Sequence, residues 1–506
     1  QTPRYQADLA IQGDRIVQIG NIAADAEAGQ TLDATGKIVA PGFVDVHNHS
    51  DGWLLKTPHL TSKTSQGFTT EVIMADGISY APVTGQTASE WILYLRGLNA
   101  LQLTDYRGWE TLADYMALLD RTNVQNSIPH IPYANLRTLA CGWGRGVPDD
   151  YQMRQILHEV EKGMDAGAVG LSTGMDYVTQ QFATTDELVE VCRAMAPQQG
   201  LYVTHVRYKK GTLTALQEAV EIGRRAGVPV HISHFKGTSP AEIETLLTYV
   251  DQVAVNEVDF SFDVYPYLPG STMLNYLLPY EVWEDGPLGV IPKLRDPSIR
   301  DRFARGLAFT PLDETFIAWV PSKENSIYQG KTLAEYIECT GQSAVDALLN
   351  LLIEENLAVL LVFRSGDDRL IDAFLQHPCY MMGSDGIYHD DSVVHPRQYG
   401  SATRLLGRCV REWHLFSLED AVYKLSGHPA KRFGLKNRGA LWEGYFADVV
   451  IFDEATVNDA ATYVEPHQPS IGVDAVVVNG TPIVSQGQPL SELGAPLPGR
   501  ALQFHR

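Results

Sequence analysis

The chain has 506 residues, of which 44% are hydrophobic and 20% are charged, a composition that excludes a disordered or fibrous protein. Its formal net charge is -22, and an acidic surface repels nucleic acid and anionic membranes, so we expect neither as a partner. The five cysteines are scattered and form no C-x-x-C pair, which argues against a disulfide framework or a thiolate zinc cluster.

The expected location of the protein is the cytoplasm. No apolar run reaches the roughly 18 residues that a membrane-spanning helix needs, and no signal peptide opens the chain. The first residue is Gln1 rather than Met, which leaves open the removal of an earlier segment. The sequence gives no indication of an oligomeric state.

Both ends of the chain are predicted to form short β-strands. The expected strands are 5–12, 15–20 and 31–39 at the start, and 448–453, 473–480 and 481–484 near the end. Asn479-Gly480 is a hairpin signal between the last two. We expect segments 1–39 and 436–506 to pair into one small β domain that flanks the rest of the chain.

Between residues 40 and 435 strands alternate with helices, which favours a parallel α/β fold. The expected strands are 38–46, 69–76, 168–174, 200–205, 228–234, 258–265 and 380–385, and the clearest helices are 109–119, 185–196, 213–226, 418–424 and 429–433. The chemically active residues follow strands, as in a TIM-like (β/α)₈ barrel. No phosphate-binding glycine motif favours a nucleotide. The alternation fails at 270–370, which predicts an insertion, and a candidate lid, after the strand 258–265, the seventh of the expected barrel.

Five of the predicted strands end in residues that bind metals or move protons. His47 and His49 are separated by a single residue and face the same side of an extended strand. The later strands contribute Asp76, His205, His234 and Asp385. Alone, each could be a buried structural histidine or a turn aspartate. Together they predict a metal-dependent barrel, because imidazoles and carboxylates bind zinc, which lowers the pKa of bound water from about 15.7 to roughly 7. Asp385 fits the proton-transfer role.

Seven motifs, spread over nearly the whole chain, resemble the N-acyl-D-amino-acid deacylases (D-aminoacylases) of the amidohydrolase superfamily. They are Pro41-Gly-Phe-Val-Asp-Val-His-Asn-His-Ser-Asp51, Gly170-Leu-Ser-Thr-Gly174, Thr204-His-Val-Arg207, Ile232-Ser-His-Phe-Lys236, Asp263-Val-Tyr-Pro-Tyr267 with Gly270-Ser-Thr272, Gly383-Ser-Asp-Gly386 and His395-Pro-Arg-Gln-Tyr-Gly400. The resemblance implies a zinc enzyme that hydrolyses the amide of a small N-acyl-D-amino acid and releases a free D-amino acid.

The resemblance also implies a role for each matching residue. His205 and His234 would hold a tightly bound zinc, His47 and His49 a weaker second metal, and Asp385 would be the general acid and base. Tyr177 would polarise the scissile carbonyl. The substrate carboxylate would lie against Lys236, Tyr267 and Arg397, with Ser271 in the adjoining loop. That loop, Ser271 to Tyr280, has no Arg or Lys, which favours neutral or hydrophobic D-side chains.

The sequence departs from the family at the second strand. The family usually has a cysteine ligand there, whereas this chain has Met74-Ala-Asp-Gly77, and the strand 168–174, the fourth of the expected barrel, has no lysine to bridge two metals. We therefore expect Asp76 to be a metal ligand, because a carboxylate can take the place of the thiolate. The number of metals stays open. So do two alternatives: cyclic-amide hydrolysis of the hydantoinase or dihydroorotase type, and a non-catalytic scaffold.

Overall fold

The computed structural model describes residues 4–23, 25–99 and 101–505. A closed barrel of parallel strands forms its centre. The strands in order are β4 (Phe43–Asp45), β5 (Phe68–Ile73), β6 (Asn126–Pro129) continued by β7 (Ile131–Pro132), β8 (Gly170–Gly174), β9 (Leu201–His205), β10 (Val230–Ile232), β11 (Phe260–Asp263) and β15 (Tyr380–Met381). The last strand meets the first through a parallel bridge between Asn48 and Gly386. The expected (β/α)₈ barrel is therefore confirmed.

The barrel strands are short and their side chains are buried on both faces, as parallel strands covered by helices require. Every residue of β5 is buried. The inside of the barrel is packed with aliphatic side chains, including Val44, Val72, Ile128 and Val203, and Phe433 belongs to the same buried cluster.

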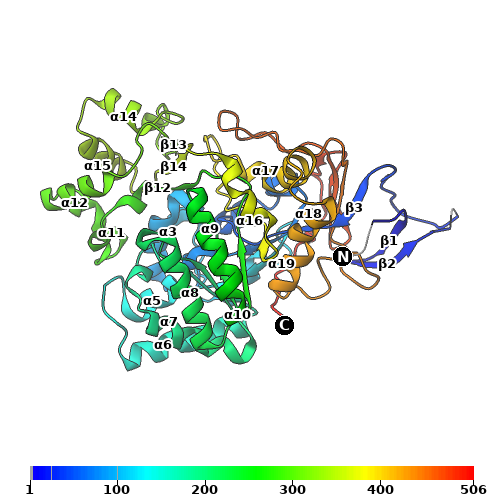
Figure 1. The fold of residues 1–506 in the computed structure, drawn as a ribbon, viewed down its shortest axis with the longest axis horizontal. Coiled ribbons are helices and arrows are strands. Elements are labelled where there is room, and N and C mark those ends of the chain that lie inside the picture. Colours follow the sequence, from blue (N-terminus) through cyan, green and yellow to red (C-terminus); the bar gives the residue numbers. More distant parts are fainter. Residues whose placement is uncertain (1–3, 24, 100, 506) are drawn as a thin grey trace.

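Helices surround the barrel and follow its strands (Figure 1). They are α1 (Asp51–Lys56), α2 (Thr61–Thr64), α3 (Gly85–Asn99), α4 (Leu112–Leu119), α5 (Tyr133–Cys141), α6 (Asp150–Asp165), α7 (Thr185–Met195), α8 (Thr212–Ala226), α9 (Pro240–Tyr249), α10 (Val255–Glu257), α16 (Asp372–Gln376), α17 (Arg397–Arg404), α18 (Leu418–Leu425) and α19 (Gly427–Arg432). Their ends follow local signals. The Thr184 hydroxyl caps α7, and Gly227 ends α8 in the left-handed conformation (φ 73°).

A five-stranded antiparallel sheet combines the two ends of the chain. Its order is β19 (Gln488–Pro489), β18 (Thr481–Ser485), β17 (Val473–Val478), β16 (Val449–Phe452) and β3 (Ile38–Pro41). Asn479 and Gly480 both have positive φ, 46° and 78°, as a two-residue hairpin turn demands. The hairpin of β1 (Asp8–Gln12) and β2 (Arg15–Gly20) projects beyond this sheet (Figure 1).

The apolar run 38–46 is two strands in two sheets, not one strand. β3 pairs with β16 in the terminal sheet, and β4 pairs with β5 in the barrel. The chain crosses between them at Gly42, where a Cβ atom would lie 2.3 Å from the Thr69 side chain. Only glycine fits this crossing. The final residues also return to the barrel, where Leu502 N donates to Ser127 O at 2.8 Å.

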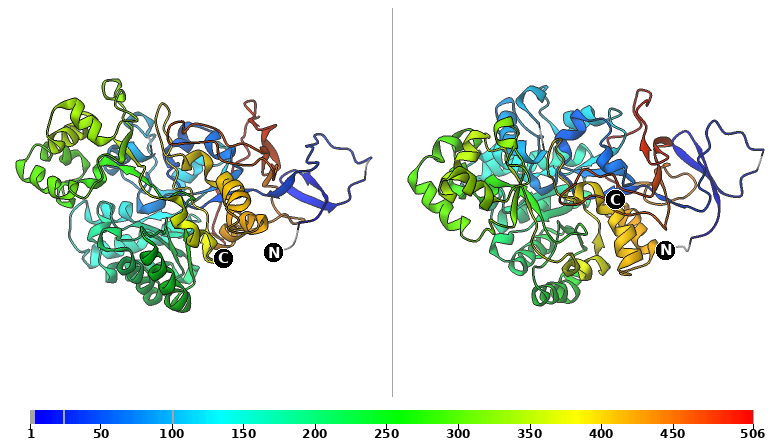
Figure 2. Two further views of the ribbon diagram at one scale, coloured as in Figure 1. Left: turned by 45° about the horizontal axis from the view of Figure 1, so that its top comes forward. Right: turned by 90° about the horizontal axis from the view of Figure 1, so that it is seen from above.

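Residues after β11, the seventh barrel strand, form a layer outside the barrel. It contains a sheet of β12 (Ser271–Met273), β14 (Leu360–Phe363) and β13 (Thr315–Trp319), with helices α11 (Pro287–Lys293), α12 (Pro297–Leu307), α13 (Lys323–Ser326), α14 (Leu333–Thr340) and α15 (Ala344–Glu354). Figure 2 shows this layer at the opposite end of the molecule from the β1–β2 hairpin. Within the described residues, no helix has both the length and the apolar composition needed to cross a membrane.

Candidate metal centre and active site

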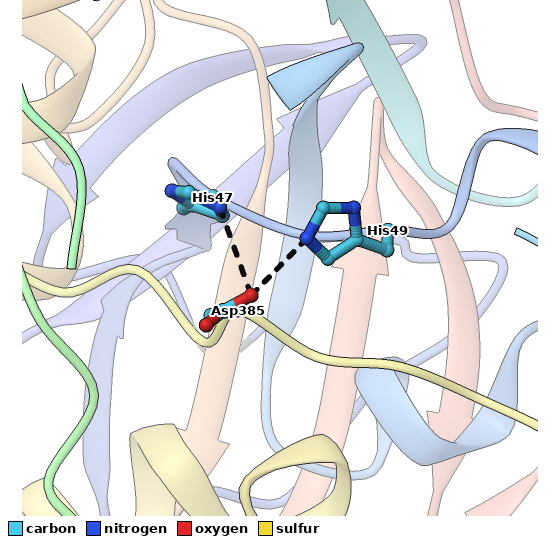
Figure 3. A group of neighbouring side chains, drawn as sticks. All are labelled: His47, His49 and Asp385. Carbon is cyan, nitrogen blue, oxygen red and sulfur yellow. Dashed lines mark ion pairs between the residues drawn. The ribbon is translucent and has the colours of Figure 1, made fainter. Parts of the chain in front are cut away.

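His47, His49 and Asp385 meet where the first and last barrel strands close the barrel (Figure 3). His49 Nε2 is 3.2 Å from Asp385 Oδ1, and His47 Nε2 is 3.7 Å from the same oxygen. Asp385 has a positive φ of 47°, and its backbone N–H donates to His47 O at 2.7 Å. Barrel closure therefore holds the three side chains together.

Asp76 lies in a tight turn beyond the second strand, which ends at Ile73 and not at Asp76 as expected. Met74 and Asp76 both have left-handed backbone conformations, with φ of 67° and 57°. The Ser172 hydroxyl donates to Met74 O at 2.7 Å, and the Gln180 amide donates to Asp76 O at 3.0 Å. The turn aims the Asp76 carboxylate at His47 (3.6 Å) and His49 (3.7 Å).

His205 ends β9 and His234 follows β10, and they complete the cluster. His205 Nδ1 is 3.0 Å from His234 Nε2, and both are 3.9 Å from the Asp76 carboxylate. His231, which lies within β10 beside Val203, instead contacts Ser261 (2.7 Å) and Asp263 (2.9 Å). His234 lies beyond β10, which ends at Ile232, and has a left-handed backbone (φ 38°), so the turn after the strand sets the direction of its side chain.

The donor atoms of this cluster fit a divalent metal ion. His47 Nε2 and Asp76 Oδ1 are buried without a hydrogen-bond partner among the described residues. Two sets of three residues could each hold an ion, because the ligand atoms within each set lie within 4.8 Å of one another. The sets are His47, His49 and Asp385, and His47, Asp76 and His234. Buried polar atoms without partners are costly, and imidazole nitrogens with carboxylate oxygens are the ligands that zinc and similar cations prefer.

The charges of the cluster also favour a bound cation. Burial alone would lower the pKa of His47, but Asp76, Asp263 and Asp385 raise that pKa to about 10, so positive charge is stabilised here. Burial, with His205 nearby, lowers the pKa of His234 to about 3, which keeps its imidazole neutral. Burial opposes ionisation of Asp385, yet Arg397 and His49 hold its pKa well below the usual value.

Arg397 and Lys236 place positive charge beside this cluster. Arg397 Nη1 is 2.9 Å from Asp385 Oδ2, and its guanidinium carbon lies 4.3 Å from the centre of the Tyr265 ring. Lys236 Nζ donates to the Tyr265 hydroxyl at 2.8 Å and to Leu268 O at 2.7 Å. Arg397 Nε is buried without an acceptor among the described residues, so this corner can bind an anion.

The hydroxyl groups of Tyr267 and Ser271 have hydrogen-bond partners other than Lys236 and Arg397. The Tyr267 hydroxyl points to Asp459 at 3.4 Å, and Tyr265 is the tyrosine beside Lys236. Ser271 Oγ donates to Leu361 O at 2.6 Å, while Ser271 O accepts from Arg397 at 3.4 Å. The structure therefore brings Tyr265 to the place for which the sequence indicated Tyr267.

Tyr177 lies against the cluster of candidate metal ligands, with its ring centre 4.9 Å from that of His205 and 5.4 Å from that of Tyr276.

Two nearby aspartates were absent from the predicted set. Asp263 accepts from His234 N at 2.9 Å, and Asp176 lies 3.4 Å from His205 Nε2. Burial opposes ionisation of Asp176, but His205 and Lys209 lower its pKa. Lys209, from the loop after β9, lies 3.8 Å from the Tyr276 ring centre.

Comparison with known proteins identifies the family. The amidohydrolase family model matches residues 30–283 and 322–484. The chain belongs to the amidohydrolase family. The unmatched residues between the two segments lie in the layer after strand 7, which is outside the barrel.

Characterised relatives cover nearly the whole of this amidohydrolase. A D-aminoacylase from Alcaligenes xylosoxydans xylosoxydans is 35% identical over 95% of this chain and 91% of its own. An N-acyl-D-glutamate deacylase from the same organism is 34% identical over 99% of this chain and 93% of its own. A similar crystal structure is that of an N-acyl-D-glutamate deacylase from Bordetella bronchiseptica, complexed with zinc and a phosphonate mimic of the tetrahedral intermediate. It has a TM-score of 0.83 at 32% identity, and the match covers 99% of this chain and 96% of that chain.

Beneath the active site, this amidohydrolase has a buried ion pair that the sequence did not indicate. Lys63 is fully buried, and its Nζ donates to Asp45 Oδ2 and to Ser384 Oγ, each at 2.5 Å. Asp45 Oδ1 accepts from Ser384 N at 2.8 Å. This network fixes the residue that precedes Asp385.

Lys63→Met is expected to lower the free energy of unfolding by about 3–5 kcal/mol, because it leaves the Asp45 carboxylate buried without its cation. Urea denaturation of the metal-free protein measures the change. Lys162→Met is the control, since Lys162 is 44% exposed beside Glu159 and a surface pair contributes about 0–1 kcal/mol. Equal losses of unfolding free energy in the two variants would show that the buried pair stabilises the fold no more than a surface pair does.

Proposed function

We propose that this amidohydrolase cleaves the amide bond of N-acyl-D-amino acids and yields a carboxylate and a free D-amino acid. The observation that carries the proposal is the buried Arg397, which touches Asp385 at 2.9 Å and keeps its Nε without an acceptor among the described residues. An anion-binding arginine next to a proton-transfer carboxylate suits a substrate with a free carboxylate close to its scissile amide. The relatives named D-aminoacylase and N-acyl-D-glutamate deacylase support the same reaction.

Zinc is the cofactor that the ligand atoms suit best. Asp76, His205 and His234 would hold one tightly bound ion, and His47 and His49 would line a second position. When bound, zinc supplies a Lewis acid and a water molecule that is nucleophilic at neutral pH. The Bordetella relative was crystallised with zinc. The structure of a D-aminoacylase (TM-score 0.83, 31% identity, 99% and 96% covered) is described as having a binuclear metal centre with one-metal activation and second-metal attenuation.

Asp385 would act as the general base and then as the general acid. Its lowered pKa keeps the carboxylate ionised, so it is ready to accept the proton of the attacking water. The same carboxyl group would then donate that proton to the leaving nitrogen, because an amine must be protonated to depart.

Arg397, Lys236 and Tyr265 would hold the substrate's α-carboxylate. The guanidinium offers a planar pair of N–H groups and the ammonium a second positive charge. The Tyr177 hydroxyl would donate a hydrogen bond to the scissile carbonyl oxygen. Burial raises the pKa of Tyr177 well above its usual value, so the phenol keeps that hydrogen.

The test compares substrates that differ only in the features the site would recognise. Purified protein is assayed with N-acetyl-D-methionine, with its methyl ester and with a hydantoin, and free amine or ring opening is measured. We expect turnover of the free acid alone. The ester loses the negative charge that Arg397 and Lys236 would bind, and charge-assisted hydrogen bonds are worth about 1.5–3 kcal/mol each.

The outcome also separates the competing reactions. Ring opening of the hydantoin without deacylation would replace the proposal with cyclic-amide hydrolysis. Equal turnover of the acid and its ester would show that the arginine does not bind the α-carboxylate. Metal-loaded protein that acts on none of the three would leave the deacylase proposal refuted.

A further inference from the structure

Asp176 is a buried carboxylate that none of the roles above uses. It follows the fourth barrel strand in the turn Gly174 to Tyr177, where Tyr177 N donates to Gly174 O at 2.9 Å. Its side chain is 3% exposed. One of its oxygens, Oδ2, has three neighbours: His205 and Lys209 from the end of β9 and the loop after it, and Tyr276 from the segment after β12.

The two ring nitrogens of His205 face different partners. Nδ1 is 3.0 Å from His234 Nε2 and 3.9 Å from Asp76 Oδ2, on the side of the metal centre. Nε2 is 3.4 Å from Asp176 Oδ2, on the opposite side. Two nitrogen ligands of a tetrahedral zinc ion lie roughly 3.3 Å apart, so the spacing of His205 Nδ1 and His234 Nε2 suits one shared ion.

We propose that Asp176 is a positioning residue that fixes His205 as an Nδ1 ligand. A neutral imidazole carries one hydrogen, and the nitrogen that binds a metal must be the other one. By accepting the hydrogen from Nε2, Asp176 leaves the Nδ1 lone pair free and aimed at the metal centre. A carboxylate in this place also makes the imidazole a stronger ligand. The inference rests on the proposed zinc-dependent function.

The same carboxylate oxygen joins the metal ligand to the wall of the substrate site. The Tyr276 hydroxyl donates to Asp176 Oδ2 at 3.4 Å, and the backbone N–H of Lys209 donates to it at 3.2 Å. Tyr276 packs against Tyr177, which in turn packs against His205. Asp176 therefore holds the loops after the fourth, fifth and seventh strands around one ligand.

The first experiment measures zinc affinity directly, without substrate. Metal-free wild type, Asp176→Asn and Tyr276→Phe are titrated with zinc in competition with a chromogenic chelator. Asn has the size of Asp but lacks its charge, so we expect zinc to bind Asp176→Asn about 10–100 times more weakly. Tyr276→Phe removes a neighbour of the same oxygen but leaves the His205 contact, and we expect it to bind zinc as wild type does.

Melting temperatures of the metal-free proteins distinguish positioning from a general structural role. The proposal predicts that Asp176→Asn melts close to wild type without metal and loses the stabilisation that zinc gives. Wild-type zinc affinity in Asp176→Asn, with a lower melting temperature of the metal-free protein, would overturn it. Wild-type protein that binds no zinc would overturn both this inference and the proposed function, whereas tight binding in both proteins would overturn this inference alone.

A crystal structure of the zinc-loaded wild type provides the check that needs no variant. We expect His205 Nδ1 on the metal and Nε2 within hydrogen-bond distance of Asp176. Coordination through Nε2 would contradict the assignment even if every variant failed to fold.

Discussion

Asp385→Asn is expected to lower kcat for N-acetyl-D-methionine by about 100- to 10,000-fold, the range that general acid–base groups contribute. The amide cannot accept the proton of the attacking water or return one to the leaving nitrogen. The tightly bound zinc should stay at one ion per chain, because Asp76, His205 and His234 are unchanged. Steady-state kinetics and metal analysis of the same sample measure the two quantities.

Asp391→Asn is the matched control for this substitution. Asp391 lies six residues further along the same segment, is exposed, and has a positive φ of 48° that asparagine adopts readily. We expect it to keep wild-type kinetics. If Asp385→Asn also keeps the wild-type kcat with its zinc in place, another group must move the proton.

Asp76→Asn is expected to have the second large effect, on metal binding. Loss of a partner that only orients a ligand costs about 10–100-fold in metal affinity, and loss of a ligand itself should cost more. Asparagine tolerates the left-handed backbone at this position, where φ is 57°, so the turn should keep its shape. Zinc titration of the metal-free variant measures the loss.

Asp76→Cys tests the same role from the other side. It introduces the thiolate that the resembling family usually has at this place, and thiolate is a good zinc ligand. We expect zinc affinity to return to, or exceed, that of wild type. If Asp76→Asn retains the wild-type affinity, Asp76 is not a ligand, and the cation must rely on the histidines alone.

The parts of the site that follow apolar strands were accessible from the sequence. His205 ends β9 and His234 follows β10, so the chain alone predicts that they meet at the C-terminal mouth of a barrel. The third strand gave no such signal. Residues Asn126 to Pro132 contain two prolines and a polar start, and only pairing with β5 and β8 makes them strands.

Residues that act through contacts between distant segments were not predictable. Asp176 and Lys63 look like ordinary turn and helix residues, and their partners lie 29 and 321 positions away at His205 and Ser384. Tyr265 and Tyr267 are two residues apart and would share a face in a strand. β11 ends at Asp263, and in the turn that follows, the two hydroxyl groups point to Lys236 and Asp459 respectively.

The most direct test is a zinc titration of the metal-free protein with N-acetyl-D-methionine and N-acetyl-L-methionine assayed in parallel. The account predicts no turnover without metal, activity toward the D-enantiomer that rises to a plateau at one zinc ion per chain, and little activity toward the L-enantiomer. Hydrolysis by the metal-free protein at the same rate, or preference for the L-enantiomer, would contradict a zinc-dependent D-aminoacylase.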